Sequence, residues 1–195
     1  MNETNQTDRF VPLFAELDRR LAGEAPVRLA IEGGSASGKT TLGKILAERY
    51  GCTVFHMDDF FLCSEQRTAA RFAEPGGNVD RERFLAEVLL PLRRGEKVFY
   101  RRFDCASMQL QKPVETAPKK LVVAEGAYSM HPDLAPYYDL SVFLDISPEL
   151  QRERISRRNT PEKAKRFFAE WIPMEQAYFA AFDIPAKCTL RISIL

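Results

Sequence analysis

Apolar residues along the chain occur in two kinds of stretch, short continuous runs and longer segments with helical spacing. The continuous runs have the length of strands and lie at 27–31, 53–57, 121–125, 140–146 and 188–194. Continuous apolar strands that alternate with helices are typical of a parallel sheet covered on both faces. The pattern therefore predicts a three-layer α/β fold, with a central parallel sheet of about five strands and helices on both faces.

Helical spacing and capping signals mark the segments between these strands. We expect helices at 7–22, from residue 42 to a stop at Gly51, from Asp80 to a kink or end at Pro91, from Ser147-Pro148-Glu149 onward, and at about 162–182. Residues 64–79 are polar and contain EPGGN, which predicts a loop. The segment 97–103 is expected to form a strand whose partner lies within 112–116, so that 97–116 makes a small arm.

Composition narrows the class of protein. The 195 residues fit a single domain over 1–195, and 45% hydrophobic with 28% charged residues excludes a disordered chain. A formal net charge of +1 gives no general attraction to nucleic acid or to an anionic membrane. We expect no signal peptide, because the N-terminus is polar, and no apolar run is long enough to span a bilayer. Four dispersed cysteines form no zinc motif, so we expect reduced thiols in a cytoplasmic protein.

A glycine-rich motif follows the first predicted strand and precedes the first internal helix. Residues 33–40 read GGSASGKT and fit the pattern G-x-x-x-x-G-K-[ST]. Such a loop turns successive N–H groups toward phosphate oxygens, with the helix N-terminus behind them. Lys39 is expected to reach the β- and γ-phosphates of ATP, and the Thr40 hydroxyl to serve Mg²⁺. The predicted nucleotide contacts are Gly33, Gly34, Ser35, Ala36, Ser37, Gly38, Lys39, Thr40 and Thr41; the alternative is a plain glycine-rich strand–helix turn.

Two acids end other predicted strands, where ligands of open α/β sheets bind. Glu125 closes the run 121–125 and is followed by Gly126, so we expect it on the Mg²⁺ side of the site. Asp58 follows the run 53–57 and is the candidate base for an acceptor hydroxyl. Asp59 points elsewhere if the strand pleat continues, and Asp145 is the weaker strand-end candidate because no glycine follows it. The alternatives are solvated acids at the sheet rim and turn-forming aspartates.

Positive charge gathers late in the chain. Residues 149–166 carry seven basic and three acidic side chains. Arg154, Arg157 and Arg158 share one helix face by their spacing, and such a cluster can hold phosphate oxygens as charge develops. The alternative is a solvated helix face.

These segments together resemble one known group, the uridine kinases among the P-loop kinases, which is similar in turn to phosphoribulokinases and pantothenate kinases. The resemblance spans about 27–195 and rests on GGSASGKT, DDFF at 58–61, NVD at 78–80, LVVAEG at 121–126 and RERISRR at 152–158. It implies a P-loop NTPase fold and a kinase that carries phosphate from ATP to a hydroxyl of a small molecule.

The resemblance also implies roles for single residues. Asp58 stands at the position of the catalytic aspartate, beside Lys39 and Arg158 as the other catalytic candidates. Asp80 stands where nucleoside kinases hold ribose hydroxyls, although a helix N-cap explains it equally well. Glu125 matches the acid on the magnesium side. Arg154, Arg157 and Arg158 match the start of a lid over about 152–166, where they are expected to contact the bound substrate.

The chain departs from the uridine–cytidine kinases where they read the pyrimidine. Phe103-Asp104 stands where they have a Tyr-Asp segment, Met108 and Leu110 stand where they have a histidine and an arginine, Phe61 replaces a tyrosine, and Asn159-Thr160-Pro161 replaces an Arg-Asp pair. A site that hydrogen-bonds a base loses selectivity without those groups, so Phe61, Phe103 and Met108 predict a more apolar acceptor pocket; the alternative is that they are core residues. Pantothenate or a nicotinamide nucleoside remain alternative acceptors, and a non-catalytic nucleotide-binding regulator remains an alternative function. The sequence contains no N-K-x-D segment, which reads guanine, so a GTPase is disfavoured.

Overall fold

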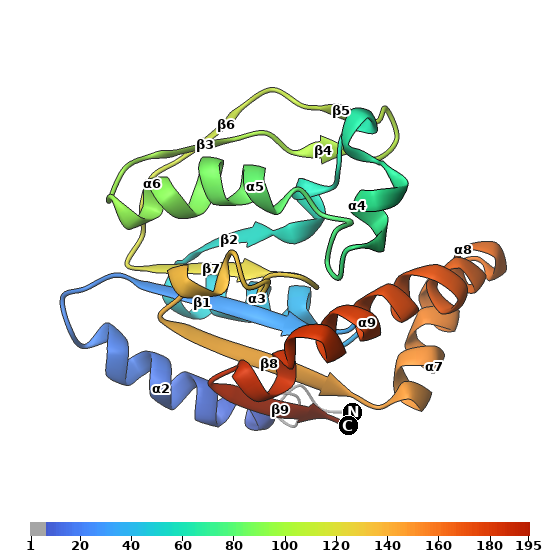
Figure 1. The fold of residues 1–195 in the computed structure, drawn as a ribbon. Helices are drawn as coiled ribbons and strands as arrows, with labels where there is room; N and C mark the ends of the chain where they lie inside the picture. The colour runs from blue at the N-terminus through green and yellow to red at the C-terminus, as the bar shows by residue number, and fades with distance from the viewer. Residues whose placement is uncertain (1–6) are drawn as a thin grey trace.

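The computed structural model describes residues 7–195 and contains a five-stranded parallel sheet at its centre (Figure 1). The strand order is β2-β7-β1-β8-β9, and every neighbouring pair is parallel. The strands are β1 (Val27–Gly33), β2 (Thr53–His56), β7 (Leu121–Glu125), β8 (Leu140–Ile146) and β9 (Leu190–Ile194). The predicted parallel sheet is confirmed, with the phosphate-loop strand β1 in the middle.

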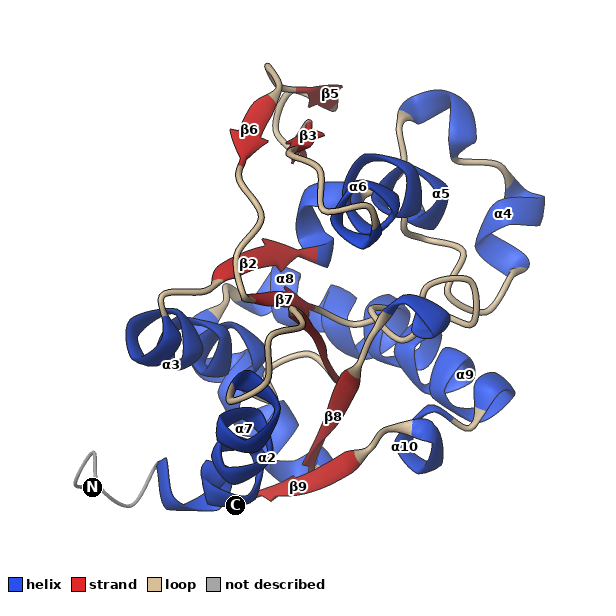
Figure 2. Cartoon of the chain, turned by 90° about the vertical axis from the view of Figure 1, so that its left-hand side faces the viewer, coloured by secondary structure: helices blue, strands red, loops and turns tan. Residues whose placement is uncertain are grey.

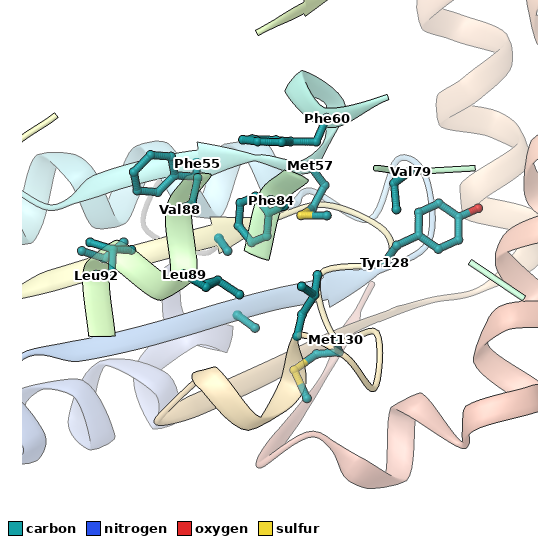
Figure 3. Packing of buried hydrophobic residues seen from close by; sticks show 14 of the residues in the cluster. Phe55, Met57, Phe60, Val79, Phe84, Val88, Leu89, Leu92, Tyr128 and Met130 are labelled. Carbon is teal, nitrogen blue, oxygen red and sulfur yellow. The ribbon is translucent and has the colours of Figure 1, made fainter. Parts of the chain in front are cut away.

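Each strand sends alternate side chains into one of two cores. Leu29 and Ile31 of β1 face the layer that contains α2 (Val11–Leu21) and α3 (Lys39–Tyr50). Ala30 faces the opposite layer, which contains the helical segment 81–93 and α9 (Ile172–Phe182). Figure 3 shows Val88, Leu89 and Leu92 of that segment against Phe55 of β2. The sheet is therefore buried on both faces, as its continuous apolar strands require.

Helix ends fall where the capping residues place them. The remaining helices are α4 (Ala69–Ala73), α5 (Arg81–Phe84), α6 (Leu90–Arg93), α7 (Pro148–Arg158), α8 (Pro161–Arg166) and α10 (Ile184–Lys187), with short 3-10 turns at Asp8–Phe10, Met57–Phe60, Ser64–Gln66 and Ala135–Tyr137. Ser147 caps α7 by accepting the N–H of Leu150 at 3.2 Å. Gly51 ends α3 with a left-handed φ of 61°.

Two prolines lie inside helices that widen before them. A π-helical turn at Leu85–Leu89 precedes Pro91, and a second at Phe167–Trp171 precedes Pro173. A proline has no N–H to donate and crowds the carbonyl four residues earlier, which a wider turn accommodates. The helix from Asp80 therefore continues past Pro91 to Arg93 instead of ending there.

The arm over 97–116 contains paired strands, and the segment before Asp80 is more ordered than the polarity of its sequence indicates. The arm consists of two antiparallel pairs, β3 (Val98–Tyr100) with β6 (Val114–Thr116) and β4 (Phe103–Asp104) with β5 (Gln109–Leu110). Figure 2 shows β3, β5 and β6 standing away from the central sheet. The prediction of a loop over 64–79 is wrong for Ala69–Ala73, which form the short helix α4; Thr68 caps it by accepting the N–H of Arg71.

Candidate functional site

The carboxyl ends of β1, β2 and β7 open into one cleft of 440 Å³. Loop residues 35–41 line it together with Asp58 and Glu125. Arg154, Arg157 and Arg158 of α7 line it from the other side. The structure thus brings together the predicted phosphate loop, both predicted acids and the predicted arginines, which are up to about 120 residues apart in sequence.

The loop backbone takes conformations that explain its glycines. Gly33 and Gly126 end the adjacent strands β1 and β7 with the same φ of 145°. A Cβ at Gly33 would lie 2.6 Å from the Leu144 carbonyl oxygen, and one at Gly126 would lie 2.5 Å from Cβ of Met57. These strand ends therefore exclude any side chain, and the chain turns away beside Glu125 as its glycine indicates.

Lys39 closes the phosphate loop onto itself. Its Nζ donates to the carbonyl oxygens of Gly33 at 2.7 Å and Gly34 at 2.9 Å. The ammonium group is therefore held at the base of the loop. The first N–H groups of α3 have no acceptor within the helix, so they can donate to a ligand. This arrangement concentrates positive charge and N–H donors at one point, which is what a phosphate group requires.

Glu125 joins the phosphate loop to the neighbouring strand. Its Oε1 accepts the Thr40 hydroxyl at 2.9 Å and contacts Nδ1 of His56 at 2.5 Å. His56 is the direct register partner of Glu125 across β2 and β7. The hydrogen bond from His56 to Glu125 raises the pKa of His56 above its ordinary value. The histidine thus orients the carboxylate toward Thr40.

Asp58 and Asp59 diverge at the end of β2. The strand stops at His56, and the 3-10 turn Met57–Phe60 follows, so the strand pleat does not continue through Asp58 and Asp59. Asp58 points into the cleft, where surrounding protein displaces water and raises the pKa of its carboxyl although the nearby Lys39 charge lowers it. Asp59 is half-buried and lies 3.5 Å from Nε of Arg102 in the arm. Only Asp58 faces the phosphate loop.

The arginines of α7 occupy different positions at the cleft. Arg154 donates through Nη1 to the Ala36 carbonyl at 3.2 Å, so it contacts the phosphate loop directly. Arg157 lies 3.7 Å from Glu153 and is exposed, and Arg158 stacks over the Phe167 ring at 5.4 Å. The pKa of Arg154 is lowered by burial and by the charges of Arg9 and Arg157. Like charges therefore outnumber the neighbouring acid Glu153 on this helix, an arrangement that a bound anion stabilises.

Three other predicted positions lie outside the cleft. Asp80 is 4% exposed and caps α5, accepting the backbone N–H of Arg83 at 3.0 Å and its Nε at 3.2 Å. Phe103 is buried in the arm, with the Arg67 guanidinium 5.9 Å from its ring. Asp145 pairs with Arg191 at 2.6 Å and is not part of the site. Contacts from Asp80 and Phe103 to an acceptor remain predictions.

Several residues of the site were not predicted from the sequence. His56 precedes Asp58 by two positions, and only its pairing with Glu125 reveals its place. Glu175 of α9 reaches the phosphate loop, and its carboxylate accepts both the N–H and the hydroxyl of Ser35. Arg9 and Phe10 of the N-terminal segment also line the cleft. No local motif marks these residues, because their partners are distant in sequence.

The donor set at Thr40 and Glu125 suits a magnesium ion that is shared with phosphate. Both side chains offer oxygen atoms, the ligands that Mg²⁺ prefers. Within residues 7–195, no group of three or more His, Cys, Asp or Glu side chains is placed to hold a metal. Mg²⁺ commonly binds through one or two protein oxygens plus phosphates and water, so these residues fit it.

The described part of the chain also contains no helix that is long and apolar enough to cross a membrane.

Comparisons with known proteins agree with this architecture. The chain is 26% identical to uridine kinase from Chloroflexus aurantiacus over 150 residues, covering 72% of this chain and 71% of that protein. It is 37% identical to thymidylate kinase from Methylobacillus flagellatus over 92 residues. That match covers 47% of this chain and 44% of the thymidylate kinase.

Solved structures show the same fold. A structure described as a possible uridine kinase from Bacillus stearothermophilus matches with a TM-score of 0.72 at 18% identity, covering 96% of this chain and 99% of the other. A candidate fructose transport system kinase from a Silicibacter species matches with a TM-score of 0.74 at 23% identity, covering 92% and 97%. A sequence model of the family described as phosphoribulokinase / uridine kinase matches residues 29–166. The chain therefore belongs to the phosphoribulokinase / uridine kinase family.

Proposed function

We propose that the protein is an ATP-dependent kinase that transfers the γ-phosphate to a hydroxyl of a small molecule. The observation that carries this proposal is a single cleft that is lined by the phosphate loop, by Asp58 and by three arginines. A nucleotide-binding regulator needs the loop, but it does not need Asp58 opposite it.

Each residue has a separate task in such a transfer. Lys39 and the N–H groups at the start of α3 hold the phosphates of ATP. Asp58 accepts the proton of the acceptor hydroxyl as that oxygen approaches the γ-phosphate. Arg154, Arg157 and Arg158 balance negative charge on the transferred group. Mg²⁺, held through Thr40 and Glu125, would supply further charge neutralisation at the β- and γ-phosphates.

The residues at the acceptor positions bear on which hydroxyl compound receives the phosphate. The family includes uridine kinases, but Phe103, Met108 and Leu110 stand where those enzymes carry polar residues that read the base. Phe103 is buried and Met108 lies exposed at the turn between β4 and β5. A base edge without partners costs about 1–3 kcal/mol per group, so two lost partners weaken uridine by roughly 30- to 10⁴-fold. We infer that uridine and cytidine are poor acceptors.

A panel of acceptors tests both the activity and this specificity. Phosphate transfer from radiolabelled ATP is measured as kcat/KM for uridine, cytidine, pantothenate and nicotinamide riboside under one condition. We expect transfer to at least one small alcohol and low values for the two pyrimidine nucleosides. A uridine value of about 10⁴ M⁻¹s⁻¹ or above would refute the specificity inference. Tight ATP binding with no transfer to any acceptor, across a wider panel, would favour the regulator.

The arginines of α7 provide a separate test of the phosphate site. Arg154→Ala, Arg157→Ala and Arg158→Ala are each expected to lower kcat more than they raise KM, because their charge acts mainly as the phosphate is transferred. Arg152→Ala is the matched control. Arg152 is on the same helix α7, but its guanidinium lies over the Phe168 ring and does not line the cleft. Steady-state kinetics of the four variants give the comparison. Wild-type behaviour of all three cleft variants would make the cluster a solvated face.

A further inference from the structure

All polar groups of Ser35 in the phosphate loop are bound by side chains of two helices. Glu175 of α9 accepts the Ser35 N–H at 2.9 Å and its hydroxyl at 2.6 Å. Gln151 of α7 donates through Nε2 to the Ser35 carbonyl at 2.8 Å. This residue of the loop is therefore fixed from outside the loop, and its N–H is not available to a phosphate.

Each helix contacts the loop region through two residues that lie one turn apart. On α7, Gln151 binds Ser35 and Arg154 binds the Ala36 carbonyl. On α9, Glu175 binds Ser35, and the Tyr178 hydroxyl donates to buried Glu32 at 3.0 Å. Glu32 in turn accepts the N–H of Gly33 at 3.0 Å, where the loop begins. The two helices thus hold the loop both at its base and at its turn.

A buried acid is an unexpected residue at the wall of a phosphate cleft. Glu175 is 4% exposed and lines the cleft near Lys39 and Asp58. Burial raises the pKa of its carboxyl, whereas the Lys39 charge and the Ser35 bonds lower it. A carboxylate offers neither an N–H group nor a positive charge to phosphate oxygens, so Glu175 is no phosphate ligand. Any effect of Glu175 on nucleotide binding is therefore transmitted through the two hydrogen bonds that it accepts from Ser35.

We infer that Glu175 is a positioning residue that, with Gln151, clamps Ser35 and holds the phosphate loop in its nucleotide-binding shape. The clamp also sets where Arg157 and Arg158 stand relative to the loop, because Gln151 and Arg154 lie on the helix that carries them. The inference rests on the proposed function, since it assumes that ATP occupies this loop. Nothing local in the sequence around Glu175 indicates the role.

Binding of ATP with Mg²⁺, measured by isothermal titration calorimetry, tests the clamp without relying on turnover. Glu175→Ala is expected to weaken ATP binding by about 10- to 100-fold and to raise the KM for ATP similarly, because hydrogen bonds to a charged group are lost. Glu175→Gln is expected to recover most of the affinity, since its amide oxygen still accepts the Ser35 N–H. The double variant Ser35→Ala/Glu175→Ala is expected to bind ATP about as weakly as Glu175→Ala alone. The Ser35 hydroxyl bond is already lost when Glu175 is removed, so deleting the hydroxyl as well adds no further cost. The KM for the acceptor is expected to change less than twofold.

Control variants separate the clamp from general charge and folding effects. Glu170→Gln removes the same charge from an exposed position that pairs with Arg166, and it is expected to bind ATP as the wild type does. Thermal unfolding of every variant shows whether it is folded; if Glu175→Ala is not, Glu175→Gln and Ser35→Ala carry the test.

Three results would overturn the inference. Tighter ATP binding by Glu175→Gln would make the carboxylate a competitor of phosphate rather than a positioning residue. Unchanged ATP affinity in both Glu175 variants would leave it no role in binding. A wild-type protein that does not bind ATP would refute the proposed function and this inference with it, a result distinct from the other two.

Discussion

Lys39→Ala is expected to nearly abolish phosphate transfer while leaving the fold intact. Among residues 7–195, the Lys39 ammonium donates to the Gly33 and Gly34 carbonyls and packs into neither hydrophobic core, so its removal disturbs no core packing. Its charge lies at the base of the phosphate loop, and loss of one such electrostatic contact typically costs about 10²- to 10³-fold in kcat. Steady-state kinetics with the acceptor identified from the panel measure the effect, and circular dichroism checks the fold.

The matched control for this variant is Lys44→Ala. Lys44 lies on the same helix α3, is exposed, and does not line the cleft. Its substitution removes an equal charge and is expected to leave kcat and KM unchanged. If Lys39→Ala transfers phosphate at the wild-type rate, the assignment of residues 33–40 as the phosphate loop is wrong.

Asp58→Asn is expected to keep ATP affinity and lose turnover by about 10²- to 10⁴-fold, because an amide cannot accept the acceptor proton. Asp59→Asn is the natural comparison, since Asp59 is adjacent in sequence but faces Arg102 rather than the phosphate loop. We expect it to be much milder. The reverse ranking in kcat would assign the base to Asp59 and would require the 3-10 turn at Met57–Phe60 to rearrange in the complex.

The pH dependence of the reaction follows from the same residue. Asp58 acts as a base only when it is deprotonated, and the surrounding protein raises the pKa of its carboxyl above the ordinary 3.8. Activity is therefore expected to fall as the pH is lowered through this raised pKa, and to stay on a plateau above it. A profile of kcat/KM against pH measures the acid limb. Any residual activity of Asp58→Asn is expected to lack that limb.

Much of the fold was predicted correctly because its signals are local. The runs at 121–125 and 140–146 are the strands β7 and β8 residue for residue, since a strand buried on both faces is apolar over most of its length. Ser147 and Gly51 cap their helices as predicted, because capping depends on neighbouring residues alone. The prolines were harder to interpret. Pro91 signals a break, but the preceding helical turn widened and removed the clash that a break would relieve.

The sequence by itself determined the phosphate loop and the order of its partners along the chain. GGSASGKT after an apolar strand, acids at the ends of two later strands and arginines on a helix face are patterns of spacing, and spacing is visible without a structure. The tertiary structure alone decided which acid faces the loop and which side chains hold it. The pairing of His56 with Glu125 depends on strand register, and the clamp of Glu175 on Ser35 spans 140 residues. Such contacts arise when the sheet order brings distant elements together, and no local pattern records that order.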